Sequence, residues 1–112
     1  VSARDWQLAT PQWLMGKTCD TFCPMGPWIV TADEVADPHN LNIGIKVSGE
    51  TLQNSSTKEL IFNIGELIEY MTQVMTLEPG DIVSTGTPPG VGMARKPEPR
   101  WLRHGDTCEV FI

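Results

Sequence analysis

The 112-residue sequence has few basic residues and no long apolar run. Its eight Lys and Arg residues are outnumbered by fourteen acidic ones, and only those between Arg95 and Arg103 are loosely grouped. A nucleic-acid surface needs a basic patch, so we expect no nucleic-acid partner. No segment approaches the roughly 18 consecutive apolar residues of a membrane helix, and no basic-then-apolar leader opens the chain. We therefore expect a soluble protein with no membrane partner.

The sequence also lacks the cysteine pairs of a structural zinc site. Its three cysteines are Cys19, Cys23 and Cys108, and the nearest two do not have CxxC spacing. Free cysteine behaves as a small apolar residue, so we expect reduced and mostly buried thiols. Reduced thiols indicate an intracellular protein.

The length of the chain corresponds to one domain, which can bury about two-thirds of its unfolded surface. The sequence opens on VSARDWQ without an initiator Met, and it ends in HGDTCEVFI. In the final segment Cys108, Val110 and Ile112 share one face of an expected strand, which stops at the last residue. We expect residues 1–112 to be a fragment, incomplete at both ends.

The segment from Leu41 to Gln53 predicts a β-hairpin. Apolar and polar residues alternate up to Val47, the chain turns at Ser48 and Gly49, and a second polar-apolar run follows. This pattern is typical of two antiparallel strands.

Residues 64–76 predict the one clear helix. Asn63 and Glu66 have the spacing of a capping box, and apolar residues then recur at helical spacing up to Met75. We interpret the methionines and Tyr70 as core and interface residues rather than a cofactor site.

The segment STGTPPGVG, residues 84–92, combines two prolines with three glycines. The run 81–85 before it predicts a short buried strand. A phosphate loop needs GxxxxGK[ST] and successive backbone N–H groups, but Pro88 and Pro89 have none and no such Lys follows. The loop instead offers Thr87, a hydroxyl on a stiff turn, to a single carboxylate. The alternative is a tight turn that binds nothing.

Two segments near the start have side chains suited to a keto acid. Arg4 and Gln7 are three apart in SARDWQ, and Lys17 follows a glycine in GKTCDTF. An Arg fork, a Lys point charge and an amide suit a small dianionic keto acid. Simpler explanations exist for each: Arg4 paired with Asp5, Lys17 exposed to solvent, and Gln7 at the molecular rim.

Four blocks together resemble the fumarylacetoacetate hydrolase family, and most closely its mitochondrial "domain-containing protein 2" branch. They are VSARDWQ (1–7), WLMGKTCDTFCPMGPWIVTADEVADPHNL (13–41), KVSGETLQNSST (46–57) and TLEPGDIVSTGTPPGVGMARKPEPRWLRHGD (76–106). The resemblance covers essentially the whole chain. It implies a mixed, mainly β fold, the β-roll of the family's C-terminal domain with one amphipathic helix, of which residues 1–112 are a part.

The resemblance also implies roles for individual residues. Lys17 matches the active-site lysine, Arg4 and Gln7 match substrate-site positions, and Thr87 matches the hydroxyl that binds a substrate carboxylate. Thr21 matches a position beside the metal. The family's divalent ion, Mg²⁺ with Mn²⁺ or Ca²⁺ as alternatives, is held by an Asp just before the SARD-type stretch and by an upstream Glu-x-Glu pair. Neither occurs in this chain, nor does the family's upstream His-Glu pair that activates water.

The implied activity is metal-dependent chemistry on small keto acids. The metal stabilises an enolate, Lys17 adds positive charge or transfers a proton, and Thr87 and Arg4 hold the distal carboxylate. Oxaloacetate keto–enol tautomerisation is expected first, with acylpyruvate hydrolysis and oxaloacetate decarboxylation as related reactions. The family also implies a homodimer, and we expect a mitochondrial or cytoplasmic location.

Differences from the family keep a second interpretation open. The segment LATPQ is shorter than in close relatives, Cys19 stands where the family usually has Phe, and the final strand stops at Ile112. The alternative is a truncated, inactive product or a module that binds keto acids without turnover. We expect the chain alone to be inactive.

Overall fold

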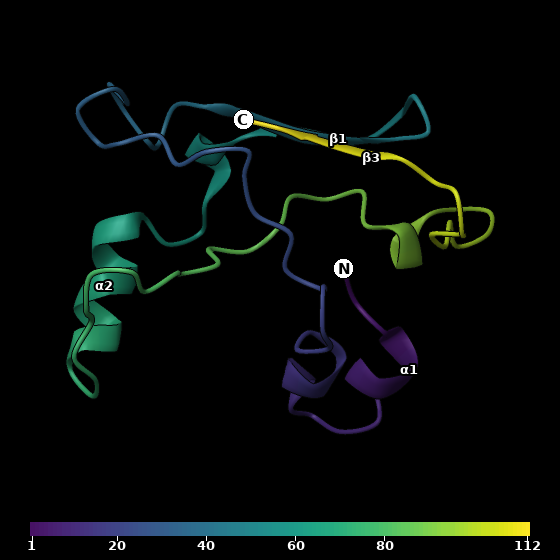
Figure 1. The fold of residues 1–112 in the computed structure, drawn as a ribbon, viewed down its shortest axis with the longest axis horizontal. Helices are drawn as coiled ribbons and strands as arrows, with labels where there is room; N and C mark the ends of the chain where they lie inside the picture. The colour runs from purple at the N-terminus through teal and green to yellow at the C-terminus, as the bar shows by residue number, and fades with distance from the viewer. The chain divides into compact units, whose positions relative to one another are not determined.

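The computed structural model describes all of residues 1–112, which divide into two compact units, residues 1–35 and 36–112. The elements in chain order are α1 (Arg4–Gln7), η1 (Trp13–Gly16), β1 (Asn42–Val47), β2 (Glu50–Ser56), η2 (Thr57–Glu59), α2 (Ile64–Thr72), η3 (Gly92–Ala94) and β3 (Cys108–Phe111), where η marks a 3₁₀ turn (Figure 1). The mainly β character with few helices is confirmed. None of the helices combines the length and apolarity needed to span a bilayer. That the chain is one partial domain stays a prediction.

The second unit is built on an open, three-stranded antiparallel sheet with the order β2-β1-β3. β1 and β2 form the predicted hairpin, joined at Ser48 and Gly49. Both turn residues have positive φ, 49° and 85°, as a two-residue type I′ turn requires. Val47 and Leu52 are the buried apolar residues of the hairpin, at 2% and 9% exposure.

β3 confirms the strand expected at the end of the sequence and pairs with β1, the middle strand of the sheet. Figure 1 shows β3 running along β1. Gly44 lies opposite Phe111, and a Cβ on Gly44 would overlap both the Phe111 ring and the backbone oxygen of Gln53. The missing side chain therefore gives the ring its place on the sheet. Lys46 lies nearby, with its Nζ 6.0 Å from the ring centroid and 3.3 Å from Glu109.

The start of α2 matches the sequence pattern. The Glu66 N–H donates to Asn63 Oδ1 at 2.9 Å, and the Asn63 N–H donates to Glu66 Oε2 at 2.7 Å, so both halves of the capping box are present. The Ile64 N–H donates to His39 Nε2 at 3.0 Å. Three donors that a helix start leaves without intrahelical partners are thus satisfied.

The end of α2 corrects the predicted range 64–76, because the helix ends at Thr72. Beyond it, the Val74 and Met75 N–H groups both bond to the Met71 carbonyl at 3.1 Å, which closes a last turn instead of continuing the helix. The chain then approaches Pro79, and a residue before proline is disfavoured in helix geometry.

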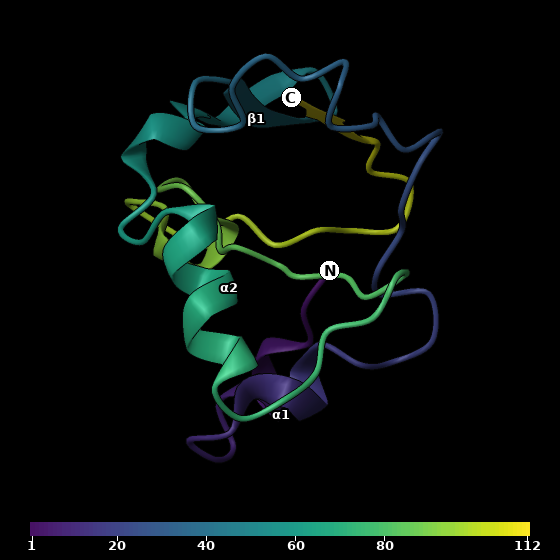
Figure 2. The same cartoon turned by 90° about the vertical axis from the view of Figure 1, so that its left-hand side faces the viewer.

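Figure 2 shows α2 along its length. Its apolar face is at most half-buried within this chain.

Residues 81–85 form no strand, so the predicted buried strand is wrong. Ile82 and Val83 are 63% and 40% exposed. A strand needs a partner for its backbone groups, and residues 81–85 pair with neither of the open edges of the sheet, β2 or β3. Asp81 instead closes the preceding turn: its N–H donates to the Glu78 carbonyl at 3.0 Å, and its Oδ2 accepts the Glu78 N–H at 2.8 Å.

The cysteines are free, as expected, but the expected burial is wrong. Cys23 and Cys108 are exposed and Cys19 is half-buried. Cys23 lies in an irregular segment, and Cys108 lies on β3, which is paired on one side only. No layer of residues within the same unit covers the side chain of either cysteine.

An ion pair fastens the segment before β3 to the hairpin turn. Arg100 donates to both carboxylate oxygens of Asp106 at 3.0 Å, and the Arg103 N–H and the Ser48 hydroxyl each donate to Asp106 at 2.8 Å. The Arg100 hydrogen bonds, followed by those from Arg103 and Ser48, hold the pKa of Asp106 well below its ordinary value. The same pair raises the pKa of Arg100.

Candidate functional site

The glycine- and proline-rich loop packs against β2 in the second unit. Gly86 and Gly90 have φ of 116° and 105°, in the region where side chains are disfavoured. A Cβ on Gly90 would overlap the Leu52 carbonyl oxygen, whereas a Cβ on Gly86 would meet open space. Gly90 therefore lets the loop backbone approach the strand, and Thr87, between the two glycines, remains exposed.

Thr87 is attached to the sheet through Gln53 on β2. Gln53 Nε2 donates to Thr87 Oγ1 at 2.9 Å and to the Pro88 carbonyl at 2.5 Å. The Thr87 hydroxyl is 3.5 Å from the same carbonyl. An amide from the sheet thus holds the Thr87 hydroxyl, while the stiffness of the loop stays a prediction.

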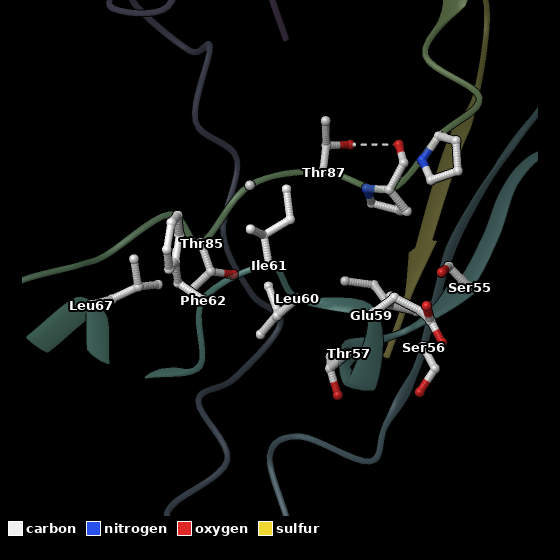
Figure 3. A pocket seen from close by; sticks show the side chains of 14 residues that line it. Ser55, Ser56, Thr57, Glu59, Leu60, Ile61, Phe62, Leu67, Thr85 and Thr87 are labelled. Atoms are coloured by element: carbon white, nitrogen blue, oxygen red, sulfur yellow. Dashed lines mark hydrogen bonds between the residues drawn. The ribbon is translucent and has the colours of Figure 1, made fainter. Parts of the chain in front are cut away.

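A hollow of about 400 Å³ lies beside this loop. Figure 3 shows Thr87 at one side of it, with Leu60, Ile61 and Phe62 from the segment after η2 and Leu67 from α2. Ser55, Ser56, Thr57 and Thr85 add hydroxyl groups, and Glu59 adds one carboxylate. The volume is within the range of small-molecule sites, and the lining is mostly apolar with a few polar groups.

The first unit brings Arg4 and Gln7 together. Both lie on α1, and Arg4 Nη1 donates to Gln7 Oε1 at 2.7 Å. Gln7 is completely buried and packs against Gly16, where a Cβ would overlap it. Its Nε2 has no partner. Arg4 therefore pairs with Gln7 rather than Asp5, and Gln7 is a buried residue rather than a rim residue.

Lys17 lies in the same unit, and its side chain is exposed. Its Nζ donates to Ser2 Oγ at 2.7 Å, and the backbone next to it is held by the Ala3 N–H, which donates to the Gly16 carbonyl at 2.9 Å. The opening SARD stretch and the GKTCDTF stretch therefore lie against each other. Of the three N–H bonds of the Lys17 ammonium, one is used by Ser2, so two are available to a ligand.

Thr21, the position expected beside a metal, is exposed and has a φ of 68°. This left-handed conformation is uncommon for a β-branched residue and is found most often at functional sites or turns. Whether Thr21, Lys17, Arg4, Gln7 and Thr87 have the roles assigned from the sequence stays a prediction, since the first four lie in the first unit and Thr87 lies in the second.

The chain by itself does not fit a divalent ion. No three His, Cys, Asp or Glu side chains are grouped so that they could share a metal. A bound Mg²⁺ prefers several oxygen ligands, including one or two carboxylates. These residues alone therefore supply no complete ligand set for such an ion.

Gln53 is the residue of the loop's surroundings that the sequence pattern did not single out. In an alternating hairpin, a polar residue reads as a solvent-facing position. Its hydrogen bonds reach across 34 residues of sequence, and no local pattern predicts such a contact. Ser2, the partner of Lys17, was missed for the same reason.

Comparisons with known proteins agree with these features. The family model described as "Fumarylacetoacetate (FAA) hydrolase C-terminal" matches residues 1–112 of this chain. "Oxaloacetate tautomerase FAHD2A, mitochondrial" of Bos taurus is 57% identical over 114 residues, which cover 98% of this chain and 36% of that protein. The chain thus spans about a third of the length of the curated relatives it matches.

Two solved structures share the fold. "Fumarylacetoacetate hydrolase (EaFAH) from psychrophilic Exiguobacterium antarcticum" superposes with a TM-score of 0.91 at 41% identity, over 98% of this chain and 41% of that chain. The 5-carboxymethyl-2-hydroxymuconate delta-isomerase from Mycobacterium smegmatis gives 0.83 at 45% identity, over 97% and 39%. Because the model of the family's C-terminal region matches residues 1–112, the chain belongs to the fumarylacetoacetate hydrolase family.

Proposed function

We propose that residues 1–112 are part of an enzyme that interconverts the keto and enol forms of oxaloacetate. The observation that supports this most is the 57% identity to the bovine protein named as an oxaloacetate tautomerase, over 98% of this chain. Solved structures named as an isomerase and as a hydrolase share the fold, which supports an enzymatic role for the family. Because that relative's name includes "mitochondrial", we also propose a mitochondrial location.

The proposed reaction moves a single proton. A C–H bond next to the keto group breaks, an O–H bond forms on the former carbonyl oxygen, and no water is consumed. Lys17 is the candidate proton carrier, because its ammonium is exposed and has two N–H bonds beyond the one given to Ser2. Its positive charge would also stabilise the enolate as it forms.

The other predicted residues have binding roles in this proposal. Thr87 offers a hydroxyl to a substrate carboxylate, and Arg4, fixed by Gln7, offers a guanidinium. Such contacts accelerate the reaction by holding the substrate in one orientation. A dependence on Mg²⁺, Mn²⁺ or Ca²⁺ and a homodimeric state remain predictions from the family resemblance.

A chimera tests the proposal. Residues 1–112 replace the matching segment of the bovine tautomerase, and the ultraviolet absorbance of enol-oxaloacetate is followed as it decays to the keto form. The chimera should accelerate this decay, and Lys17→Ala should slow it by about 100-fold or more, the usual contribution of a proton-transferring side chain. Lys58→Ala, at an exposed lysine outside the proposed roles, is the matched control.

Two results would count against this assignment. Unchanged turnover in Lys17→Ala would remove the proton-transfer role of Lys17. A chimera that cleaves acetylpyruvate but leaves enol-oxaloacetate unchanged would point instead to hydrolysis.

A further inference from the structure

We propose that Gln53 is a positioning residue that sets the Thr87 hydroxyl as a hydrogen-bond donor toward a substrate carboxylate. The inference rests on the proposed carboxylate-binding role of Thr87. The proposed carboxylate site then includes a residue of β2 as well as the residues of the loop.

The backbone of β2 directs Gln53 to the loop. Opposite β1 the register shifts, so that Ile45 pairs with Gln53 while the next residue, Lys46, pairs with Thr51. Leu52 is thus an extra residue, which makes this a β-bulge, and it is buried. Bulges change the direction of the side chains beside them. Gln53, anchored next to the buried Leu52, reaches the loop.

The chemistry of the partners fixes which end of the amide faces the loop. The Pro88 carbonyl can only accept a hydrogen bond, so the nitrogen of the Gln53 amide, and not its oxygen, must face it. That nitrogen has two N–H bonds. One is directed to the Pro88 carbonyl at 2.5 Å and the other to Thr87 Oγ1 at 2.9 Å.

This arrangement determines what Thr87 can do. Its oxygen already accepts from Gln53, so its own proton needs an acceptor elsewhere. Its hydrogen bond to the Pro88 carbonyl is long, at 3.5 Å against the usual O–H···O distance of about 2.7–2.8 Å, and the same carbonyl accepts a much shorter bond from Gln53, at 2.5 Å. Figure 3 shows this long contact as a dashed line at the side of the hollow. The proton is therefore available to an incoming anion.

A carboxylate is the ligand that this geometry suits. An ionised carboxylate only accepts hydrogen bonds, so a hydroxyl whose proton is directed outward is matched to it. Without Gln53 the hydroxyl is free to rotate and to turn its lone pairs outward, where they oppose a carboxylate. Gln53 thereby favours binding of the anion without touching it.

The test compares two substitutions at one position in the chimera. Gln53→Ala removes the donor and should raise the KM for oxaloacetate about three- to tenfold, the value of one hydrogen bond, with a smaller change in kcat. Gln53→Glu keeps the shape but accepts from Thr87 and repels the substrate, so its KM should rise further. Asn54→Ala and Asn54→Asp, at the exposed neighbour on β2, are the matched controls and should leave KM unchanged.

A double substitution separates positioning from mere packing. If Gln53 acts through the Thr87 hydroxyl, Gln53→Ala should change KM less than twofold once Thr87→Val is present. Equal effects of Gln53→Ala in both backgrounds would overturn the proposal, as would a Gln53→Glu variant with the parent's KM.

Binding of malonate, a dicarboxylate that does not enolise under these conditions, keeps this result distinct from the proposed function. If the chimera lacks turnover but its malonate Kd rises threefold or more in Gln53→Ala, the tautomerase assignment fails and the role of Gln53 stands. A malonate Kd unchanged by Gln53→Ala, or no malonate binding at all, would overturn the role of Gln53.

Discussion

Adding one methyl group to each of two glycines in the same loop should have unequal effects. Gly86 and Gly90 both have positive φ, 116° and 105°, so alanine at either position has an unfavourable backbone conformation. Their surroundings differ, because a Cβ on Gly86 meets nothing within contact distance and a Cβ on Gly90 overlaps the Leu52 carbonyl oxygen. The pair therefore separates backbone strain from the packing of the loop on β2.

The two contributions have different sizes. Strain at a positive φ costs about 1–3 kcal/mol, and replacing Gly by Ala returns about 0.4–1 kcal/mol by restricting the unfolded chain. Gly86→Ala should therefore lower the free energy of unfolding by about 1–2 kcal/mol. Gly90→Ala should add about 1–3 kcal/mol for overpacking, since a backbone carbonyl in a strand cannot rotate away as a side chain can.

Urea unfolding of the chimera and its two variants, followed by circular dichroism, measures the difference. The midpoint for Gly90→Ala should lie below that for Gly86→Ala. Because the displaced loop bears Thr87, Gly90→Ala should also raise the KM for oxaloacetate. Equal midpoints for the two variants would refute the close packing of the loop on β2.

Two further predictions concern stability. Asp106→Asn should destabilise the chimera at neutral pH and should make its stability fall less steeply in acid. The reason is that Arg100 lowers the pKa of Asp106 in the folded state. The contribution of Asp106 to the free energy of unfolding is therefore complete above the ordinary carboxyl pKa of 3.8 and is lost as the pH falls below it. Urea midpoints from pH 7 to 3 measure this, and the same pH dependence in Asp106→Asn would contradict it. Asn63→Ala should cost about 1 kcal/mol by removing the cap of α2, while Asn54→Ala should leave the urea midpoint nearly unchanged; equal losses would argue against the capping box.

The local features of this protein could be predicted from its sequence. The hairpin follows from alternation and a two-residue turn, and the start of α2 follows from Asn63 and Glu66, three residues apart. The loop could be excluded as a phosphate cradle because Pro88 and Pro89 have no N–H. The family could be recognised because its motifs are contiguous blocks in a fixed order.

The predictions from sequence were wrong where a local pattern is compatible with more than one structure. The apolar run 81–85 has the composition of a buried strand, but a strand requires a partner that lies elsewhere in the chain. Apolar spacing that continues past Thr72 predicts a longer helix, whereas α2 ends at Thr72 and is followed by a turn. The cysteines were expected to be buried from residue type alone, although burial depends on what covers each position.

Sequence alone thus determined the hairpin, the start of α2 and the family, because caps, turns and motifs depend on neighbours a few residues away. Only the tertiary structure decided how the loop is held. The bulge at Leu52 turns Gln53 toward the loop, where it donates a hydrogen bond to Thr87, 34 residues further along the chain. Gly90 lets the loop approach β2. The orientation of a hydroxyl proton depends on distances between groups that are remote in sequence, and for that reason the contact of Gln53 with Thr87 emerged only from the folded chain.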